Sequence, residues 1–374
     1  MIPSEKASAK PIWGIIRLVL SIFLFLYSLL TLIPLWWNEG ILYNLTALED
    51  SGGICGMSLV LFLIPKHNLI PAYRFTRWLP LLAFLLLLQP AIRASREFHK
   101  LDESVTPGAL KAFSWGRWIK GNKPPVASKR VEIQASDNKK LEGFVFHKNG
   151  LVGKRPLILI LHGGGFTTGS AIHGAELAIC LADHEWITAS VDYRLAPETA
   201  YPGQIEDVKN WISYLRNHAN ELDIDTTKIF LAGESAGATI ALNSAYTLHD
   251  PKIGAVANLY GITSADKSQA ELWESITEPL DMLDAYRGST SLDEINPVAQ
   301  CSLGGIPTIS IHGQKDPIVH WQHAQILSDA LAKAHIDQQL VLLPWATHLF
   351  NHPGFGPSGQ LSVEYIDRFF RRHL

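Results

Sequence analysis

The distribution of apolar and charged residues changes near residue 129 of this 374-residue chain. Before that point, three runs carry no charged side chain: 18–37, 51–65 and 78–92. The first run has 20 residues and ends in Trp36-Trp37, and a helix of that length spans the hydrocarbon core of a bilayer. Paired tryptophans are typical of the membrane–water interface. The other two runs have 15 residues each, which is short for a full crossing.

We predict that residues 1–94 form an α-helical membrane domain, with three helices at about 14–37, 50–66 and 76–94. The two shorter runs also suit buried core helices or re-entrant segments, and this alternative stays open. A cleaved signal peptide is disfavoured, because the first apolar run is too long and no small-x-small cleavage site follows it.

Charges between these runs bear on the topology of a multi-pass membrane protein. The loop after the first run is acidic, whereas the loop at 66–77 is basic. By the positive-inside rule, this pattern slightly favours a location outside the cytoplasm for the rest of the chain. Basic residues at 93–100 argue for the opposite side, so the side stays open.

After residue 129, short apolar runs rich in β-formers alternate with helical patterns. The segments 130–135 and 141–147 are typical of a pair of edge strands joined through Asp137-Asn138. Six further strands are predicted, at 156–161, 187–191, 228–232, 255–260, 307–311 and 339–343. Fully apolar strands separated by helices predict a doubly wound, mostly parallel sheet that is covered on both faces.

The helices between these strands are also readable. Apolar residues recur at helical spacing in 204–219 and 322–335. We therefore predict an α/β catalytic domain over residues 129–374. The stretch 95–128 is mixed in charge, and it is either a linker or a segment that folds as a cap over the catalytic face.

Composition narrows the classes of partner. The chain is 47% hydrophobic and 18% charged, with a formal net charge of −3 and no concentrated basic stripe, so nothing indicates nucleic acid. The three cysteines are scattered, and none has a histidine at metal-ligand spacing. We expect no disulfide framework, no metal and no cofactor.

A candidate nucleophile lies in Gly233-Glu234-Ser235-Ala236-Gly237. The motif follows a predicted strand and precedes a helical pattern at 238–248, which is the strand–turn–helix setting of a nucleophile elbow. Two glycines suit this turn because side chains two positions either side of the serine would collide with the adjacent strand and helix. We predict Ser235 as the nucleophile.

A serine nucleophile needs a base that is oriented by a third group. Asp316 follows the strand at 307–311, and His348 follows the strand at 339–343, so both fall at the carboxyl edge of the sheet with the serine. The order serine, acid, histidine is that of doubly wound hydrolases. The rival acids are Asp281 and Asp284, and the rival bases are His320 and His352; none follows a strand as closely.

A glycine triplet comes directly after the strand at 156–161, in His162-Gly163-Gly164-Gly165-Phe166. Backbone N–H groups without side chains around them can face an oxyanion, so we predict the amides of Gly164, Gly165 and Ala236 as its donors. A merely flexible turn is the alternative. We expect His162 to brace this loop rather than to act as a base.

These motifs resemble the hormone-sensitive-lipase family of α/β-hydrolases. The matching segments, which lie in the family's order within 155–374, are His162–Gly165, Val-Asp-Tyr-Arg-Leu-Ala-Pro-Glu at 191–198, Gly233–Gly237, Asp316-Pro317 and His348-x-Phe350. The resemblance implies a cofactor-free carboxylesterase or lipase that forms an acyl-enzyme, with 192–198 as a scaffold element. The amino-terminal region departs from the family, whose members place soluble cap helices there. An arrangement of membrane segments before a hydrolase is similar to that of isoprenylcysteine methylesterase-like proteins.

The expected function is therefore a membrane-anchored serine hydrolase that cleaves a small-molecule or lipid-like carboxylic ester. An amidase or deacetylase on the same fold is the first alternative. A non-catalytic ligand receptor is the second, and it is disfavoured because all three triad residues are present. Besides the ester, the lipid bilayer is the expected partner, whereas the oligomeric state is not indicated.

Overall fold

The computed structural model describes residues 9–32, 47–63, 78–103, 113–121, 124–265 and 278–374. These residues form two compact units, each described separately below. One unit comprises Met1–Asn122 and Phe355–Leu361, and the other comprises Lys123–Gly354 and Ser362–Leu374. We call them the helical unit and the sheet unit.

The sheet unit contains one eight-stranded sheet in the order β1-β2-β4-β3-β5-β6-β7-β8. Its strands are β1 (Val126–Gln134), β2 (Lys140–Lys148), β3 (Arg155–Leu161), β4 (Ile187–Val191), β5 (Ile224–Glu234), β6 (Ile253–Leu259), β7 (Thr308–Gly313) and β8 (Gln338–Leu343). β2 pairs antiparallel with β1 and β4, and all the other neighbours are parallel. The predicted mostly parallel sheet with an antiparallel edge pair is confirmed.

Both faces of the central strands are buried. Along β3, Leu159 belongs to the main hydrophobic core, and its neighbours Ile158 and Ile160, which point to the opposite face, are equally inaccessible. On that opposite face, Phe230 of β5 stacks on Phe370 with ring centroids 4.7 Å apart. This two-sided burial explains why the strands are continuous apolar runs rather than alternating ones.

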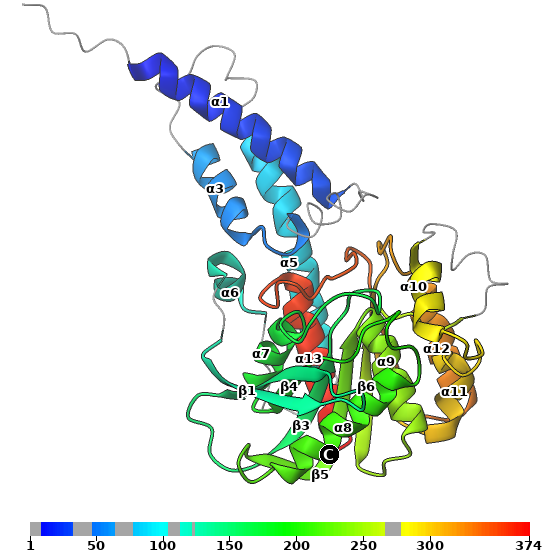
Figure 1. Cartoon of the computed structure of the whole chain (residues 1–374). Coiled ribbons are helices and arrows are strands. Elements are labelled where there is room, and N and C mark those ends of the chain that lie inside the picture. The colour runs from blue at the N-terminus through cyan, green and yellow to red at the C-terminus, as the bar shows by residue number, and fades with distance from the viewer. Residues whose placement is uncertain (1–8, 33–46, 64–77, 104–112, 122–123, 266–277) are drawn as a thin grey trace, which may run out of the picture. The chain divides into compact units, whose positions relative to one another are not determined.

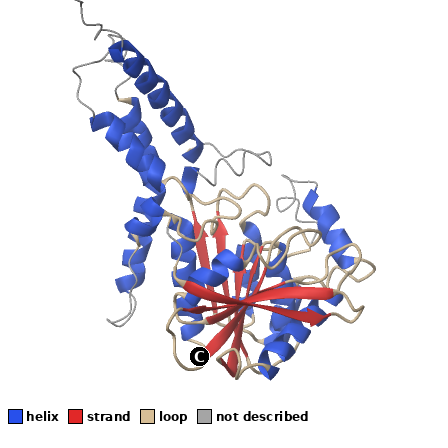
Figure 2. Ribbon diagram, turned by 60° about the vertical axis from the view of Figure 1, so that its left-hand side comes forward, coloured by secondary structure: helices blue, strands red, loops and turns tan. Residues whose placement is uncertain are grey.

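Helices surround this sheet (Figure 2). They are α7 (Ala175–Ala182), α8 (Gly203–Asn217), α9 (Ala236–Thr247), α10 (Glu278–Arg287), α11 (Pro297–Gly304), α12 (Gln322–Lys333) and α13 (Pro357–Arg371). α8 shows why they form. Val208, Trp211, Ile212 and Leu215 are buried on one stripe, whereas Lys209 is exposed.

The helical unit is built mainly from three long helices, visible together in Figure 1. Its elements are α1 (Ala9–Ser28), η1 (Leu29–Thr31), α3 (Gly52–Leu63), α5 (Leu79–Glu103) and α6 (Trp115–Lys120). α5 extends to Glu103, beyond the predicted end at 94. The apolar run ends before the helix does, because the last turns of α5 carry polar and charged residues. The predicted helix segments 33–37, 64–66 and 76–77 lie outside the described residues.

Small side chains allow these helices to approach closely. Ala83, Leu87, Ala91 and Ala94 recur at helical spacing on α5, and all are fully buried. Arg17 of α1 is also buried, and its guanidinium donates to the Leu61 carbonyl of α3 at 2.7 Å. A polar group that finds its partner within a helix bundle is typical of segments that have no access to water.

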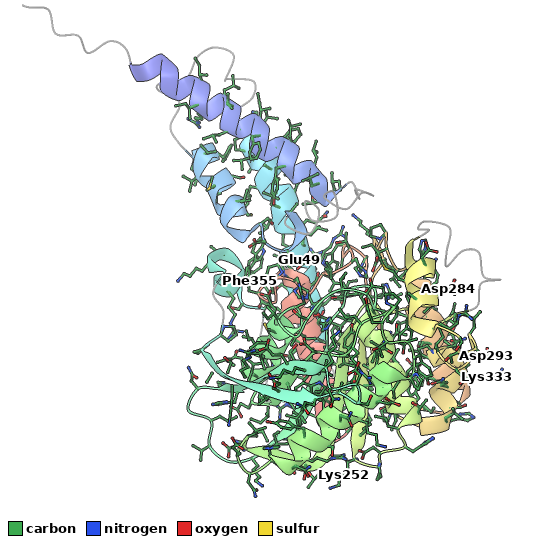
Figure 3. All side chains as sticks on the ribbon, viewed as in Figure 1. Glu49, Lys252, Asp284, Asp293, Lys333 and Phe355 are labelled. Atoms are coloured by element: carbon green, nitrogen blue, oxygen red, sulfur yellow. The ribbon has the colours of Figure 1, made fainter. Side chains whose placement is uncertain are left out.

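A buried glutamate, Glu49, contacts two other segments of the helical unit. Glu49 accepts from the Ser358 amide at 2.8 Å and from its hydroxyl at 2.5 Å. The Glu49 carbonyl accepts from Trp118 Nε1 at 3.1 Å. Ser358 lies in the first turn of α13, where amide groups have no partner within the helix, so Glu49 caps that turn. Glu49 and Phe355 are labelled close to the start of this helix in Figure 3.

One helix in the part of the chain that the structure describes is long and apolar enough to cross a membrane. It is Leu79–Phe98, within α5, and one third of its most apolar window is buried inside the protein. Ile15–Thr31 and Gly52–Leu63 are apolar but shorter. By length and composition, one helix meets the requirement for a membrane span, and the three predicted spans stay a prediction.

Candidate active site

The nucleophile turn joins β5 to α9. Ser235 has φ of 52° and ψ of −121°, a region that costs a non-glycine residue about 1–3 kcal/mol and is found mainly at functional sites. A Cβ on Gly233 would collide with the carbonyl of Gly237, and a Cβ on Gly237 would collide with the carbonyl of Leu161. Close backbone approach therefore requires both glycines, as the sequence predicts.

The three residues of the predicted triad lie within hydrogen-bonding distance of one another. His348 Nε2 is 3.1 Å from Ser235 Oγ, and His348 Nδ1 is 2.7 Å from Asp316 Oδ2. All three side chains follow the carboxyl ends of parallel strands, namely β5, β7 and β8. The arrangement allows His348 to accept the serine proton while Asp316 fixes its tautomer.

Asp316 is held by donors on both of its oxygens. Oδ1 accepts from the amides of Ile318 at 2.8 Å and Val319 at 2.9 Å. Oδ2 faces His348 and also His312 Nε2, which lies 3.3 Å away. Burial alone would raise the pKa of Asp316, but the two imidazoles outweigh it and hold that pKa below its ordinary value. The carboxyl group is therefore ionised at neutral pH.

The glycine triplet lies beside the nucleophile turn. A Cβ on Gly163 would be 3.3 Å from Ser235 Cβ. Gly164 and Gly165 have φ of 127° and 58°, which are conformations that side chains rarely allow. Among the described residues, their amides have no hydrogen-bond partner, and the amide of Ala236 is in the free first turn of α9. These three amides are therefore not occupied by other described groups, and their role as oxyanion donors stays a prediction.

A scaffold element braces this loop from behind. The ring of Tyr193 stacks on that of His162 with centroids 4.3 Å apart, and its hydroxyl donates to the His162 carbonyl at 2.9 Å. Asp192 accepts from the amides of Ala171 and Glu142 at 2.6 and 3.0 Å. His162 is fully buried behind the loop and does not face Ser235 through any hydrogen bond in the described structure, which fits bracing rather than base catalysis.

The rival acids and bases lie elsewhere. Asp281 and Asp284 are on α10, where Asp284 pairs with Arg287 at 3.2 Å and is partly exposed (Figure 3). His320 precedes α12 and is not hydrogen-bonded to Ser235 in the described structure. His352 instead binds Glu234, with Nε2 3.0 Å from Oε1.

Sequence reasoning missed the polar residues that surround the triad. Besides His312, they are Glu234, Tyr260, Asn351 and His352. Glu234 is marked in the sequence only by its place next to the nucleophile. Tyr260, Asn351 and His352 lie in loops, where no periodic pattern marks a buried polar group, and His312 lies near the end of β7.

No candidate for a metal centre appears in the described ranges, where no three His, Cys, Asp or Glu side chains gather in a ligand-like group. Cys55, Cys180 and Cys301 are buried and are not joined in disulfides. The groups that gather at the site are a serine hydroxyl, an imidazole, a carboxylate and backbone amides.

Comparison with known proteins agrees with this fold. The BD-FAE family model matches residues 145–331. A Mycobacterium tuberculosis protein named "Probable carboxylic ester hydrolase LipM" is 27% identical over 232 residues, covering 57% of this chain and 53% of LipM. Esterase LipC of the same organism is 27% identical over 245 residues, covering 58% of this chain and 59% of LipC. The chain thus spans less than two thirds of the length of either relative.

Solved structures share the fold. A bacterial heroin esterase superposes with a TM-score of 0.59 at 20% identity, covering 76% of this chain and 92% of that enzyme. Esterase LipW from Mycobacterium marinum superposes with a TM-score of 0.56 at 20% identity, covering 76% and 88%. Both carry the α/β-hydrolase architecture described above.

Proposed function

The chain belongs to the BD-FAE family of carboxylesterase-type α/β-hydrolases, and on this basis we propose that it is a membrane-anchored serine esterase with Ser235, His348 and Asp316 as its triad. The observation that carries the proposal is the pair of short contacts at His348, 3.1 Å to Ser235 Oγ and 2.7 Å to Asp316 Oδ2. A strained serine at a helix N-terminus beside unpartnered glycine amides supports it.

The proposed reaction has two steps. Ser235 Oγ attacks the ester carbonyl while its proton passes to His348 Nε2, and Nδ1–H keeps its hydrogen bond to ionised Asp316. The oxyanion is bound by the amides of Gly164, Gly165 and Ala236. The alcohol leaves with the proton from His348. Water then attacks the acyl-enzyme, with His348 again as base, and releases the acid.

Membrane anchoring is the second part of the proposal. It is supported by the large apolar side chains that the helical unit leaves exposed, such as Val19, Phe23 and Leu26 on α1 and Leu85 on α5. Single exposed apolar side chains are ordinary in soluble proteins, whereas a concentration of them is typical of an interaction surface. A bilayer around α1, α3 and α5 would cover them. An enzyme anchored in this way would meet lipid-like esters, and we propose these as its substrate class.

The decisive experiment combines a fluorophosphonate probe with p-nitrophenyl esters of increasing chain length. Ser235→Ala should abolish labelling and lower kcat on the order of 10⁶-fold, as loss of a triad serine does elsewhere. The matched control is Ser213→Ala, which changes an exposed serine on α8. It should keep both the fluorophosphonate labelling and the kcat of the wild type. Labelling that survives in Ser235→Ala would refute the assignment.

The substrate class needs its own comparison. Matched ester and amide substrates should differ, with the ester cleaved far faster. Long-chain esters presented in vesicles should be preferred over acetate esters in solution. Preference for the amide would indicate the amidase alternative, and good turnover of soluble short esters alone would contradict a lipid-like substrate.

A further inference from the structure

A second polar network surrounds the nucleophile turn, and the mechanism above does not use it. Glu234 precedes Ser235 at the end of β5, and its side chain is 2% exposed. Glu234 Oε1 accepts from Asn351 Nδ2 and also faces His352 Nε2 at 3.0 Å. A carboxylate is thus buried one residue from the atom that must carry out nucleophilic attack.

His352 lies between two carboxylates. Nε2 faces Glu234, and Nδ1 is 3.8 Å from Glu176 Oε2 on α7. Because a carboxylate faces each ring nitrogen, the imidazole is best satisfied with a proton on both. Burial alone would lower the pKa of His352, but Glu234 and Glu176 outweigh it and raise this pKa to about 10.

Asn351 connects the same carboxylate to the catalytic base. Its Oδ1 accepts from the Tyr260 hydroxyl, and the Tyr260 ring meets the His348 ring at 61° with centroids 4.6 Å apart. Asn351 and Tyr260 are fully buried. The loop that carries His348 is therefore tied to the nucleophile turn at two consecutive residues, Asn351 and His352.

We propose that His352 is a positioning residue in its imidazolium form, which neutralises the Glu234 carboxylate beside Ser235 and fastens the His348 loop to the nucleophile turn. This inference rests on the proposed function, because it concerns the ionisation of His348 as the base. The charged and titratable groups that face His348 are Asp316, His312, Tyr260 and, one residue from Ser235, Glu234. Those that face His352 are Glu234 and Glu176.

The reason for neutralisation is electrostatic. An unpaired Glu234 carboxylate would favour protonated His348, and so would raise the pKa at which the base becomes available. It would also oppose the negative charge that develops on the oxyanion. With His352 protonated, the pair has no net charge, and both effects largely cancel.

The test is the pH dependence of kcat/KM, whose acid limb reports the pKa of the free enzyme's base. In His352→Gln, Glu234 is left unpaired, so the acid limb should move up by about one pH unit. In Glu234→Gln, the carboxylate beside Ser235 is removed and the positive charge on His352 keeps only Glu176 as a partner, so the acid limb should move down. The double variant should return close to the wild-type value. Shifts of the same sign in both single variants would overturn the proposal.

A charge-preserving variant separates electrostatics from shape. His352→Lys keeps a cation next to Glu234 and should restore the acid limb toward wild type, although its kcat falls about tenfold through imperfect fit. If the role depended only on the shape of the imidazole, the acid limb of the pH profile would be shifted as far in His352→Lys as in His352→Gln. If His352→Gln fails to fold, Glu234→Gln, which is isosteric, decides alone: an unmoved acid limb would refute neutralisation.

The rate of fluorophosphonate labelling should be followed over the same pH range. It depends on the ionisation of the same base, His348, but does not require an ester substrate. Wild-type protein that is not labelled at Ser235 would refute the proposed function. Labelling of Ser235 with identical pH profiles in wild type, His352→Gln and Glu234→Gln would refute only the inference about His352.

Discussion

In the sheet unit the large apolar side chains are buried, whereas in the helical unit many are exposed. Among the described residues, most of the exposed large hydrophobic side chains lie on α1, α3 and α5, for example Phe23 at 62% and Val60 at 60%. In the sheet unit such cases are single, like Ile172. Scattered exposed hydrophobics are ordinary, but a concentration of them marks a surface that another apolar phase covers.

The two units also differ in how they treat buried charge. In the sheet unit, the buried carboxylates of Asp316 and Glu234 lie at the nucleophile turn and its histidine, whereas that of Asp207 pairs with Arg194. In the helical unit, Arg17 and Glu49 are buried far from any nucleophile in sequence and pair with backbone groups and Ser358. Our proposal places the chemistry in the sheet unit and the anchoring in the helical unit, and variants that disturb one property at a time can test it.

After the loss of Ser235 itself, the largest effect is expected at Asp316. Asp316→Asn should lower kcat by about 10⁴-fold, because the amide no longer holds His348 in the tautomer that accepts the serine proton. The fraction of protein in the membrane should not change. Steady-state kinetics and membrane fractionation measure the two properties side by side.

The matched controls for this variant are the rival acids Asp281 and Asp284. Asp281→Asn and Asp284→Asn should retain activity within a fewfold, because both residues lie on α10 and outside the hydrogen bonds of His348. A large loss in either variant, with activity kept in Asp316→Asn, would reassign the acid.

A smaller effect is expected on membrane insertion. Leu85 of α5 is 53% exposed, and Leu85→Lys should disfavour insertion by about 2.5–3.5 kcal/mol if the residue faces hydrocarbon near the centre of a span. That corresponds to roughly a hundredfold change in the insertion equilibrium, which glycosylation mapping in microsomes can measure.

Ile172→Lys is the control, because Ile172 is similarly exposed but belongs to the sheet unit. It should leave insertion unchanged. If α5 were a helix of a water-soluble surface, lysine at position 85 would be as harmless as lysine at 172. Equal insertion of both variants would therefore contradict the proposed span.

Much of the sheet unit was predictable because its elements are set by local patterns. Apolar runs such as 156–161 are buried on both faces and can be recognised without knowledge of their neighbours. Ser235, Asp316 and His348 could be placed at one edge because each follows a strand, and parallel strands end at the same edge. The glycines of the nucleophile turn were predictable from crowding alone.

Other features depend on contacts between distant segments and left no pattern in the sequence. Glu234 and His352 are 118 positions apart, and neither belongs to a periodic run that would indicate burial. The association of Phe355–Leu361 with the helical unit depends on Glu49, which reads in the sequence as an ordinary loop acid. The end of α5 at Glu103 was missed because its last turns are polar, and hydropathy reports only the apolar part of a helix.

The smallest effect concerns Glu49 and would sharpen the contrast between the two sets of buried charges. Burial raises the pKa of Glu49 to about 8, although the hydrogen bonds from Ser358 act in the opposite direction. The folded state therefore favours the protonated acid. The stability that this contributes is complete below about pH 4.5, the ordinary pKa, and is lost as the pH rises through about 8.

Glu49→Gln cannot ionise, so it should remove this loss. Hydrogen exchange of the peptide that contains the Ser358 amide is the appropriate local measurement, because that amide donates to Glu49 at 2.8 Å. Relative to wild type at the same pH, protection in Glu49→Gln should improve by at least about tenfold between pH 5 and pH 9, because each pH unit between the folded and unfolded pKa values is worth about 1.4 kcal/mol. Glu198→Gln, an exposed acid of the sheet unit, should show no such trend. A constant difference between Glu49→Gln and wild type across this range would mean that Glu49 remains ionised when buried, held by the first turn of α13 as a charged cap.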